Sequence, residues 1–224
     1  MKHKIFILCV FILFNHSLTG QTSDILSYEI GVDLLQLPAS TINASCRTNI
    51  TPFFSIVVNG GYTLNAEKSI QMYKELFAPF SKHEESVDEK NIDNQSGRFL
   101  QTGIDINFRG SIDQPNYLFL GAYLTDSYLY QRYYYHRNYY YGTYDDGYDE
   151  HYLHIYSFTG SFGWHFQFMS ILASEIRVNL SFPTDNAKTM YGNQKFIPGM
   201  GYKDTSDNVY IFPMLSWKII LPVN

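Results

Sequence analysis

Hydrophobic and polar residues alternate with a period of two along most of the chain after Ser27, the pattern of a β-strand with two different faces. In the segment 99–109, Leu100, Ile104 and Phe108 fall on one side, while Asp105 and Arg109 fall on the other. The same alternation predicts eight strands, over residues 28–37, 41–50, 53–64, 99–109, 117 to about 130, about 152 to 166, 171–182 and 209–221. Most of these segments run ten residues or more. Strands of globular proteins average about 5 to 6 residues, whereas strands that cross a bilayer at a tilt need about 9 to 11.

The predicted connections are short at one end of the strands and long at the other. Short turns lie around Thr51-Pro52, at 110–116 and at 167–170. At the other end, one connection is short, at 38–40, and three are long, at 64–98, 131–151 and 183–208. Outer-membrane barrels have this asymmetry, with the long loops outside the cell. An even strand number then places both chain termini in the periplasm.

One long connection contains a pattern of helical type. Between Asn65 and Pro79, the residues Ile70, Tyr73 and Phe77 have near-helical spacing. Asn65 is a candidate N-cap and Pro79 a stop, which predicts a short amphipathic helix over the barrel rim.

The two faces of the predicted strands differ in charge. The positions assigned to the apolar face hold no Asp, Glu, Lys or Arg, as expected for a face in contact with lipid. The opposite face carries four acidic and four basic residues, Glu29, Asp33, Asp105 and Glu175 with Arg47, Arg109, Arg177 and Lys218. The interior of an eight-stranded barrel is just wide enough to be filled by side chains. We therefore expect an internal network of ion pairs and no open pore.

The first 20 residues have the features of a secretory signal peptide. Lys2 and Lys4 precede the apolar run Ile5 to Phe14, and small and polar residues follow up to Gly20. A run of ten residues is too short for a membrane-spanning helix, which needs about 20. Residues 1–20 are thus predicted to be removed, and residues 21–224 to form the barrel.

Composition narrows the class of protein further. Loss of Lys2 and Lys4 leaves 14 of the 16 basic residues against 21 acidic ones, a net charge of −7, which argues against nucleic acid as a partner. Only Cys46 remains in the mature chain, so no internal disulfide can form. Aromatic residues make up 17% of the chain, and a barrel in lipid uses such residues at its two interfaces.

With these features, the mature chain resembles the OmpA/OmpX-like family of small eight-stranded outer-membrane barrels. The resemblance lies in the signal peptide, in segments such as 101–108 (QTGIDINF) and in the closing segment 215–221 (LSWKIIL). It implies an antiparallel, up-and-down transmembrane β-barrel in a bacterial outer membrane. Gln21 at the mature start and the Tyr- and Asn-rich composition look like proteins of Bacteroidetes-type bacteria.

The most unusual stretch is rich in tyrosine, and two interpretations of it stay open. It includes Tyr133, Tyr134, Tyr135, Tyr139, Tyr140, Tyr141, Tyr144 and Tyr148. Tyrosine offers contact area at low entropy cost, so the stretch is a candidate surface for an extracellular glycan or protein. Alternatively, strands five and six continue beyond the membrane as a hairpin, with tyrosines paired across it.

The sequence predicts no catalytic residue, metal site or cofactor. Residues 145–150 are acidic but do not match a calcium-binding EF-hand loop. His151 and His154 are three apart, so on a strand they point to opposite faces, and the parity of Cys46 turns it toward lipid. We therefore predict a monomeric, non-enzymatic outer-membrane barrel that contacts outer-membrane lipid and has an envelope-structural or surface-contact role. The alternative is a soluble lipocalin-like barrel that carries a small apolar ligand inside.

Overall fold

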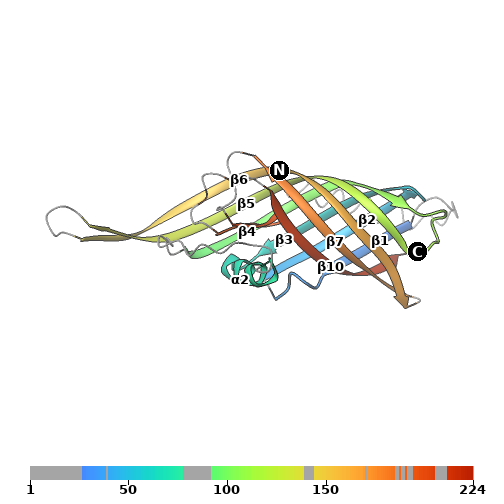
Figure 1. Cartoon of the computed structure of the whole chain (residues 1–224), viewed down its shortest axis with the longest axis horizontal. Coiled ribbons are helices and arrows are strands. Elements are labelled where there is room, and N and C mark those ends of the chain that lie inside the picture. The colour runs from blue at the N-terminus through green and yellow to red at the C-terminus, as the bar shows by residue number, and fades with distance from the viewer. Residues whose placement is uncertain are drawn as a thin grey trace.

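The chain forms one closed antiparallel barrel of eight strands, and the prediction of this architecture is confirmed. The computed structural model describes residues 27–38, 40–77, 92–138, 144–169, 171–184, 187, 190, 194–204 and 211–223. The barrel strands are β1 (Ser27–Asp33), β2 (Thr41–Thr51), β3 (Phe54–Thr63), β4 (Ile92–Phe108), β5 (Tyr117–Asn138), β6 (Tyr144–Met169), β7 (Leu172–Pro183) and β10 (Phe212–Val223). Each strand pairs with its neighbours in sequence, and β1 closes the barrel against β10 (Figure 1). The predicted signal peptide, 1–20, lies outside the described residues.

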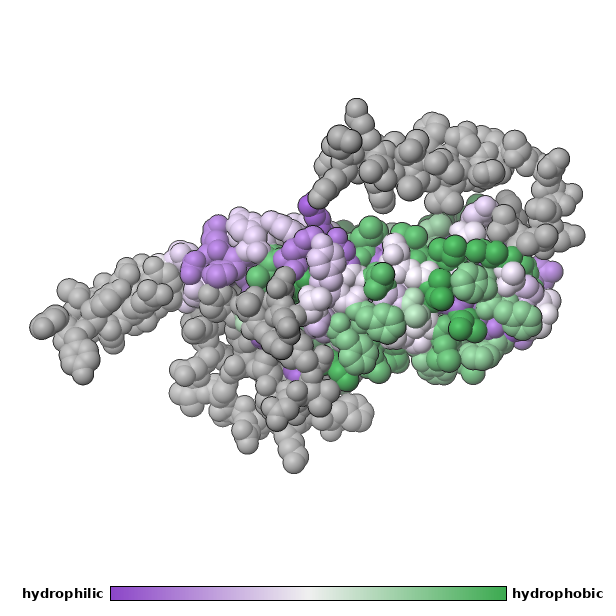
Figure 2. All heavy atoms as spheres, turned by 90° about the horizontal axis from the view of Figure 1, so that it is seen from above, coloured by the Kyte–Doolittle hydropathy of each residue, from purple (hydrophilic) through white to green (hydrophobic). Residues whose placement is uncertain are grey.

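Apolar side chains point outward from all eight strands. Figure 2 shows the hydrophobic surface as a band along the barrel wall. We call this band the apolar belt; it includes Ile30, Ile42, Ile56, Ile104, Leu120, Phe162, Val178 and Trp217. The inward positions between them are mostly polar and buried. This inversion of the usual arrangement follows from the period of two, because each strand presents one face to each side of the barrel.

Asp126 is an exception to the predicted absence of charge on the outward face. It follows the outward residues Leu118 to Leu124 of β5 with the same parity, and half of its side chain is exposed. It lies opposite Leu100 of β4 and Tyr156 of β6, at the end of the apolar belt. The prediction failed here because β5 continues beyond the belt, where an exposed carboxylate keeps its water.

Strands β5 and β6 extend beyond the other barrel strands; β4 stays paired with β5 as far as Ile92↔Tyr133, and beyond that point β5 and β6 alone stay paired. Residues 126–138 pair with residues 144–156 up to Asn138↔Tyr144, and we call these segments the β5–β6 ribbon (Figure 1). The connection predicted over 131–151 is therefore wrong in its bounds, as is the one over 64–98, because β4 already begins at Ile92. Cross-strand tyrosine contacts, such as the 5.1 Å between the ring centroids of Tyr130 and Tyr152, explain the extra length.

The predicted helix is confirmed as α2 (Ala66–Phe77), which lies beside the barrel mouth (Figure 1). Its Tyr73 is completely buried, stacks on Phe196 with 5.8 Å between ring centroids, and donates a hydrogen bond to the Leu215 carbonyl at 3.2 Å. Within the described part of the chain, no helix is long and apolar enough to cross a membrane.

A second feature at the mouth, absent from the predicted elements, is a small hairpin of β8 (Gln194–Ile197) and β9 (Gly201–Asp204). Its Ile197 and Met200 are fully buried in one cluster with Leu129 of β5, Ile155 of β6 and Phe212 of β10. The turn of the hairpin needs Gly199, which has φ +75° and lies so close to Phe99 that a Cβ would be 2.3 Å from that ring. The hairpin therefore fills the mouth of the barrel.

Candidate functional site

Arg47 on β2 is the centre of an ion-pair cluster inside the barrel. Its Nη1 donates to Glu29 at 3.2 Å, and its Nη2 donates to Asp105 at 2.8 Å and also to Glu175. Arg177 binds the last two carboxylates as well, with 3.0 Å from its Nη2 to Asp105 and 2.9 Å from its Nε to Glu175. Two guanidinium groups thus share two carboxylates in the middle of the lumen.

Lys218 on β10 completes the cluster, with its Nζ 3.7 Å from Oε1 of Glu175. The cluster therefore brings together six of the eight predicted lumen charges, three basic and three acidic, so its formal charge is zero. None of the six side chains is more than 9% exposed. Such a buried arrangement is tolerable because each charge has an opposite partner and hydrogen bonds.

The other two predicted charges, Asp33 and Arg109, form no ion pair with the six described residues of this cluster, although Asp33 lies opposite Lys218 in the β1–β10 register. Asp33 accepts hydrogen bonds from Ser216 Oγ at 2.5 Å and from the backbone N–H of Leu35 at 3.1 Å, so it closes the turn after β1. Arg109 donates to the carbonyls of Pro52 and Ile112, both at 2.9 Å. Both residues therefore secure chain turns at the ends of the barrel.

Aromatic residues of β5 support the cluster, although they were not predicted as site residues. The guanidinium groups of Arg47 and Arg177 lie 5.1 and 4.6 Å from the ring centroid of Phe119. Tyr123 donates to Asp105 and accepts from Arg177. The ring of Phe119 fits only because Gly163 lies opposite it, where a Cβ would be 2.2 Å from the ring. Their inward parity on β5 was the available sequence signal.

His165 on β6 links the ion-pair cluster to the end of the barrel at which Arg109 lies. Its ring stacks on Tyr117 with 4.6 Å between centroids, and its Nδ1 is 3.3 Å from Nη1 of Arg47. On the other side, the guanidinium of Arg109 lies 4.5 Å from the Tyr117 ring centroid. A continuous stack thus joins Arg109, which is outside the ion-pair cluster, to Arg47 at its centre.

A hydrogen-bonded chain of uncharged residues crosses the lumen next to the cluster. Lys218 Nζ donates to Asn59 at 2.9 Å, and Asn59 donates to Gln101 at 2.7 Å. Gln101 donates to Thr125 at 3.0 Å. Thr125, Thr159 and Ser181 continue the chain through their hydroxyl groups. Side chains from six strands, β10 and β3 to β7, are therefore connected across the interior.

Together, the ion-pair cluster, the hydrogen-bonded chain and the β8–β9 hairpin fill the lumen. The cavity among Glu29, Arg47, Glu175, Arg177 and Lys218 measures about 10 Å³, room for about one water molecule. The alternative prediction, a lipocalin-like carrier, is wrong for this structure. A carrier needs an apolar lumen with space for a ligand, whereas here the apolar residues face outward and the interior is polar and packed.

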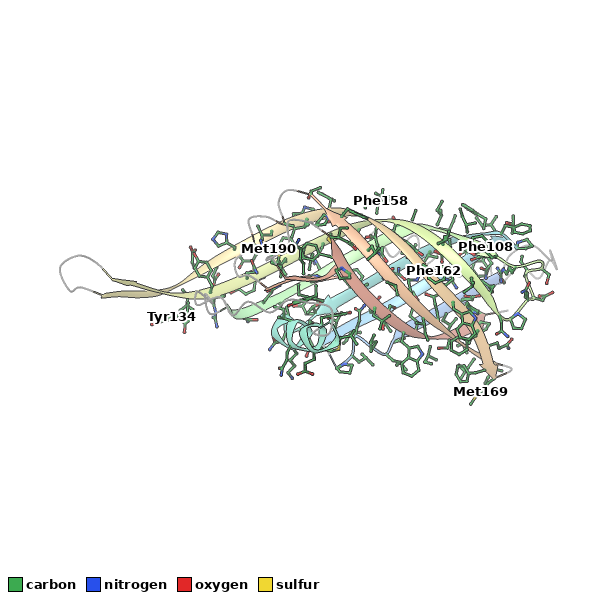
Figure 3. The ribbon with its side chains drawn as sticks, viewed as in Figure 1. Phe108, Tyr134, Phe158, Phe162, Met169 and Met190 are labelled. Atoms are coloured by element: carbon green, nitrogen blue, oxygen red, sulfur yellow. The ribbon has the colours of Figure 1, made fainter. Side chains whose placement is uncertain are left out.

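The β5–β6 ribbon holds the predicted tyrosine surface. Tyr134 and Tyr148 lie on its outward face with 5.5 Å between ring centroids, and Figure 3 shows Tyr134 far from Phe108 at the other end of the barrel. Tyr133 points to the opposite face and is buried. Tyr139, Tyr140 and Tyr141 lie outside the described residues, and only the backbone is described for Tyr135 and Tyr144. Of the predicted tyrosines whose side chains are described, Tyr134 and Tyr148 therefore lie on one face and Tyr133 on the other.

His151 and His154 of the ribbon point to opposite faces, as predicted. His154 pairs with Asp126 on the outward face, and His151 Nε2 lies 3.6 Å from Asp149 on the inward face. Tyr133 donates a hydrogen bond to Asp149 and thereby lowers the pKa of that carboxyl below the ordinary aspartate value. Among the residues that the structure describes, no group of three His, Cys, Asp or Glu side chains is placed to hold a metal ion.

Comparison with known proteins yields one similar solved structure to report. No protein-family model and no curated protein matches the chain. The crystal structure of the N-terminal β-barrel domain of Pseudomonas aeruginosa OprF is similar at 10% sequence identity and a TM-score of 0.37, over 91% of this chain and 100% of that domain. The closed barrel itself follows from the strand order and register of this chain.

Proposed function

We propose that this protein is a bacterial outer-membrane β-barrel with a closed lumen, an envelope-structural role, and a surface-contact role through its β5–β6 ribbon. The observation that carries this proposal is the apolar belt on all eight strands of a closed barrel whose charges lie inside. A closed barrel satisfies its backbone hydrogen bonds without water, which is the condition for strands in a lipid bilayer.

The size of the exposed apolar surface supports a lipid environment. Phe162, Trp164 and Trp217 are 51%, 47% and 45% exposed, and Phe108 is 55% exposed at the end of β4 (Figure 3). Soluble monomers rarely expose contiguous apolar patches larger than a few hundred Å². On β4, the apolar belt runs from Leu100 to Phe108, and these nine residues match the length that a tilted strand needs to cross the hydrocarbon layer.

The filled lumen supports a structural role over transport. A pore would need a continuous water-filled path, but the ion-pair cluster and the hairpin occupy the section of the barrel that such a path would cross. The absence of enzymatic activity, the monomeric state and the Bacteroidetes-type origin stay predictions.

Fractionation combined with a gel-shift test examines this proposal. We expect the protein in the outer-membrane fraction, soluble only with detergent, and expect unheated protein to run at a different apparent mass from boiled protein. Both results would follow from a closed barrel in lipid. Recovery of folded protein from the periplasm without detergent would overturn the membrane placement.

A further inference from the structure

The outward wall of β4, β5 and β6 changes its chemistry directly beyond the apolar belt. At the last level of the belt, Leu100 of β4 lies opposite Asp126 of β5. At the next outward level, which we call a rung because its residues pair across neighbouring strands, Arg98, Tyr128 and His154 are aligned. Further rungs pair Tyr130 with Tyr152, Arg132 with Glu150 and Tyr134 with Tyr148. We call Arg98, Tyr128, Tyr130, Arg132, Tyr148 and Tyr152 the outer platform. It continues the wall that faces lipid and begins where the aliphatic residues end.

The rings of the outer platform are held by their neighbours. Tyr152 lies 5.1 Å from Tyr130 and 6.2 Å from Tyr128, measured between ring centroids. The guanidinium of Arg98 lies 5.5 Å from the Tyr128 centroid, and that of Arg132 lies 5.0 Å from the Tyr148 centroid. Tyr130 also donates to Glu150, 3.1 Å away, which restrains its hydroxyl. A partner would therefore meet rings that are already ordered, at a small entropy cost.

This ordered surface is open to the surroundings. Tyr148 and Tyr152 are 59% and 61% exposed, although both are large aromatic residues. Its charges are balanced, since Arg98 and Arg132 are matched by Asp126 and Glu150 on the same face. A balanced surface favours neither an anionic headgroup nor a strongly charged peptide. Flat ring faces between polar groups instead suit a partner with an apolar face and a rim of hydroxyl groups.

From this geometry we infer that the outer platform binds the neutral saccharide headgroup of a glycolipid in the outer leaflet. The C–H face of a sugar ring packs on the electron-rich face of a tyrosine. The arginine, carboxylate and phenol groups beside it supply partners for the sugar hydroxyls. The outer platform lies directly beyond the apolar belt. A lipid whose acyl chains lie along the belt would therefore have its headgroup at the height of Tyr128 and His154, which favours a sugar that is attached to a lipid. This inference rests on the proposed outer-membrane placement.

The test uses three diacylglycerol lipids that differ only in headgroup: a neutral disaccharide, phosphoglycerol and phosphoethanolamine. The full mature protein is inserted into vesicles with equal amounts of all three, extracted in mild detergent, and its bound lipids are counted by mass spectrometry. We expect the disaccharide lipid to be enriched about tenfold over the other two, as two ordered ring contacts can supply. The double variant Tyr128→Ala/Tyr152→Ala should lose this enrichment.

A matched control is Phe108→Ala, which removes an exposed aromatic from the same wall at the opposite end of β4; it should keep the enrichment. Heat-dependent gel mobility confirms that each variant is folded, and the single variant Tyr152→Ala, whose ring lies 6.2 Å from that of Tyr128, replaces the double variant if that one does not fold. Equal enrichment of phosphoglycerol lipid, or full enrichment in the folded platform variant, would overturn the inference while leaving the membrane placement intact. Failure of the wild-type protein to insert would reject both.

Discussion

The lumen of the barrel and the β5–β6 ribbon are built from the same residue types in opposite surroundings. In the lumen, Arg47 and its three carboxylates are almost completely buried. On the ribbon, the side chains of Asp126 and His154, which contact each other, are about half exposed. Water competes for the polar atoms of Asp126 and His154 but does not reach those of Arg47 and its carboxylates. The comparison shows that burial, more than residue identity, separates polar contacts that are shielded from water from those that water can reach.

The largest expected effect comes from breaking the buried side of this comparison. Arg47→Met leaves three buried carboxylates short of a partner, so we expect the free energy of unfolding to fall by about 3 to 5 kcal/mol. Urea unfolding in phospholipid vesicles, followed by gel mobility, measures it. Glu150→Gln on the exposed ribbon is the control and should change stability by less than about 1 kcal/mol. Equal losses in the two variants would show that burial does not make the difference.

A second prediction compares the belt with the ribbon on one strand. Ile104→Lys places a charge in the middle of the apolar belt, and we expect a loss of about 2 to 4 kcal/mol in vesicles. Ser96→Lys, on the same face of β4 but beyond the belt, should be nearly neutral because its ammonium group stays in water. The same urea titration in vesicles measures the free energy of unfolding of both variants. A neutral Ile104→Lys would mean that the belt does not face hydrocarbon.

The contact between α2 and the barrel should show a smaller effect. Tyr73→Phe removes the hydrogen bond to the Leu215 carbonyl but keeps the ring on Phe196, so we expect a loss of about 1 kcal/mol. Unfolding in urea again measures this loss in the free energy of unfolding. Tyr148→Phe, which alters an exposed phenol of the ribbon, serves as the comparison and should leave stability unchanged. No loss in Tyr73→Phe would show that the hydrogen bond adds nothing to the docking of α2.

The smallest expected change concerns titration on the ribbon. The hydroxyl of Tyr133 lowers the pKa of Asp149, so Tyr133→Phe should raise that pKa toward the ordinary aspartate value of about 3.9. Asp149 has a lower pKa in the folded than in the unfolded protein. The stabilisation of the folded state by the Tyr133–Asp149 hydrogen bond is therefore present above the unfolded pKa and is lost as the pH falls through the folded pKa. Carboxyl carbon chemical shifts in a pH titration measure it. An unchanged Asp149 pKa in the variant would assign the shift to another neighbour.

Much of the barrel was predictable because its strands alternate so regularly. The inward assignment of Arg47, Glu175 and Lys218 needed only parity, and so did the outward assignment of Ile104. The limits of β5 and β6 were harder to predict, because Asp126 interrupts the apolar face while cross-strand tyrosine contacts keep the strands paired up to Asn138↔Tyr144. The predicted end of strand five near Tyr130 was therefore too early, whereas the interpretation of the tyrosine-rich stretch as a hairpin that continues strands five and six, with tyrosines paired across it, is confirmed.

The β8–β9 hairpin was not predictable for a different reason. Its strands are four residues each, too short for periodicity to show, and their burial depends on contacts with Leu129, Ile155 and Phe212 of distant strands. Similarly, the inward parity of Phe119 on β5 placed it in the lumen but not beside the charges, because a phenylalanine on a strand that is apolar on both sides looks like any other core residue. Only the arginines that lie against it define its role.

By itself, then, the sequence determined the number of barrel strands, the face on which each side chain lies and the helix in the first long connection, because these depend on local periods of two and 3.6 residues. The tertiary structure alone decided which charges meet. Arg47 reaches Asp105 and Glu175, 58 and 128 residues away along the chain, only because β1 closes against β10 and sets the stagger of all eight strands. Closure also decided that Asp33 and Arg109 stay outside the cluster and that a hairpin near the end of the chain fills the mouth.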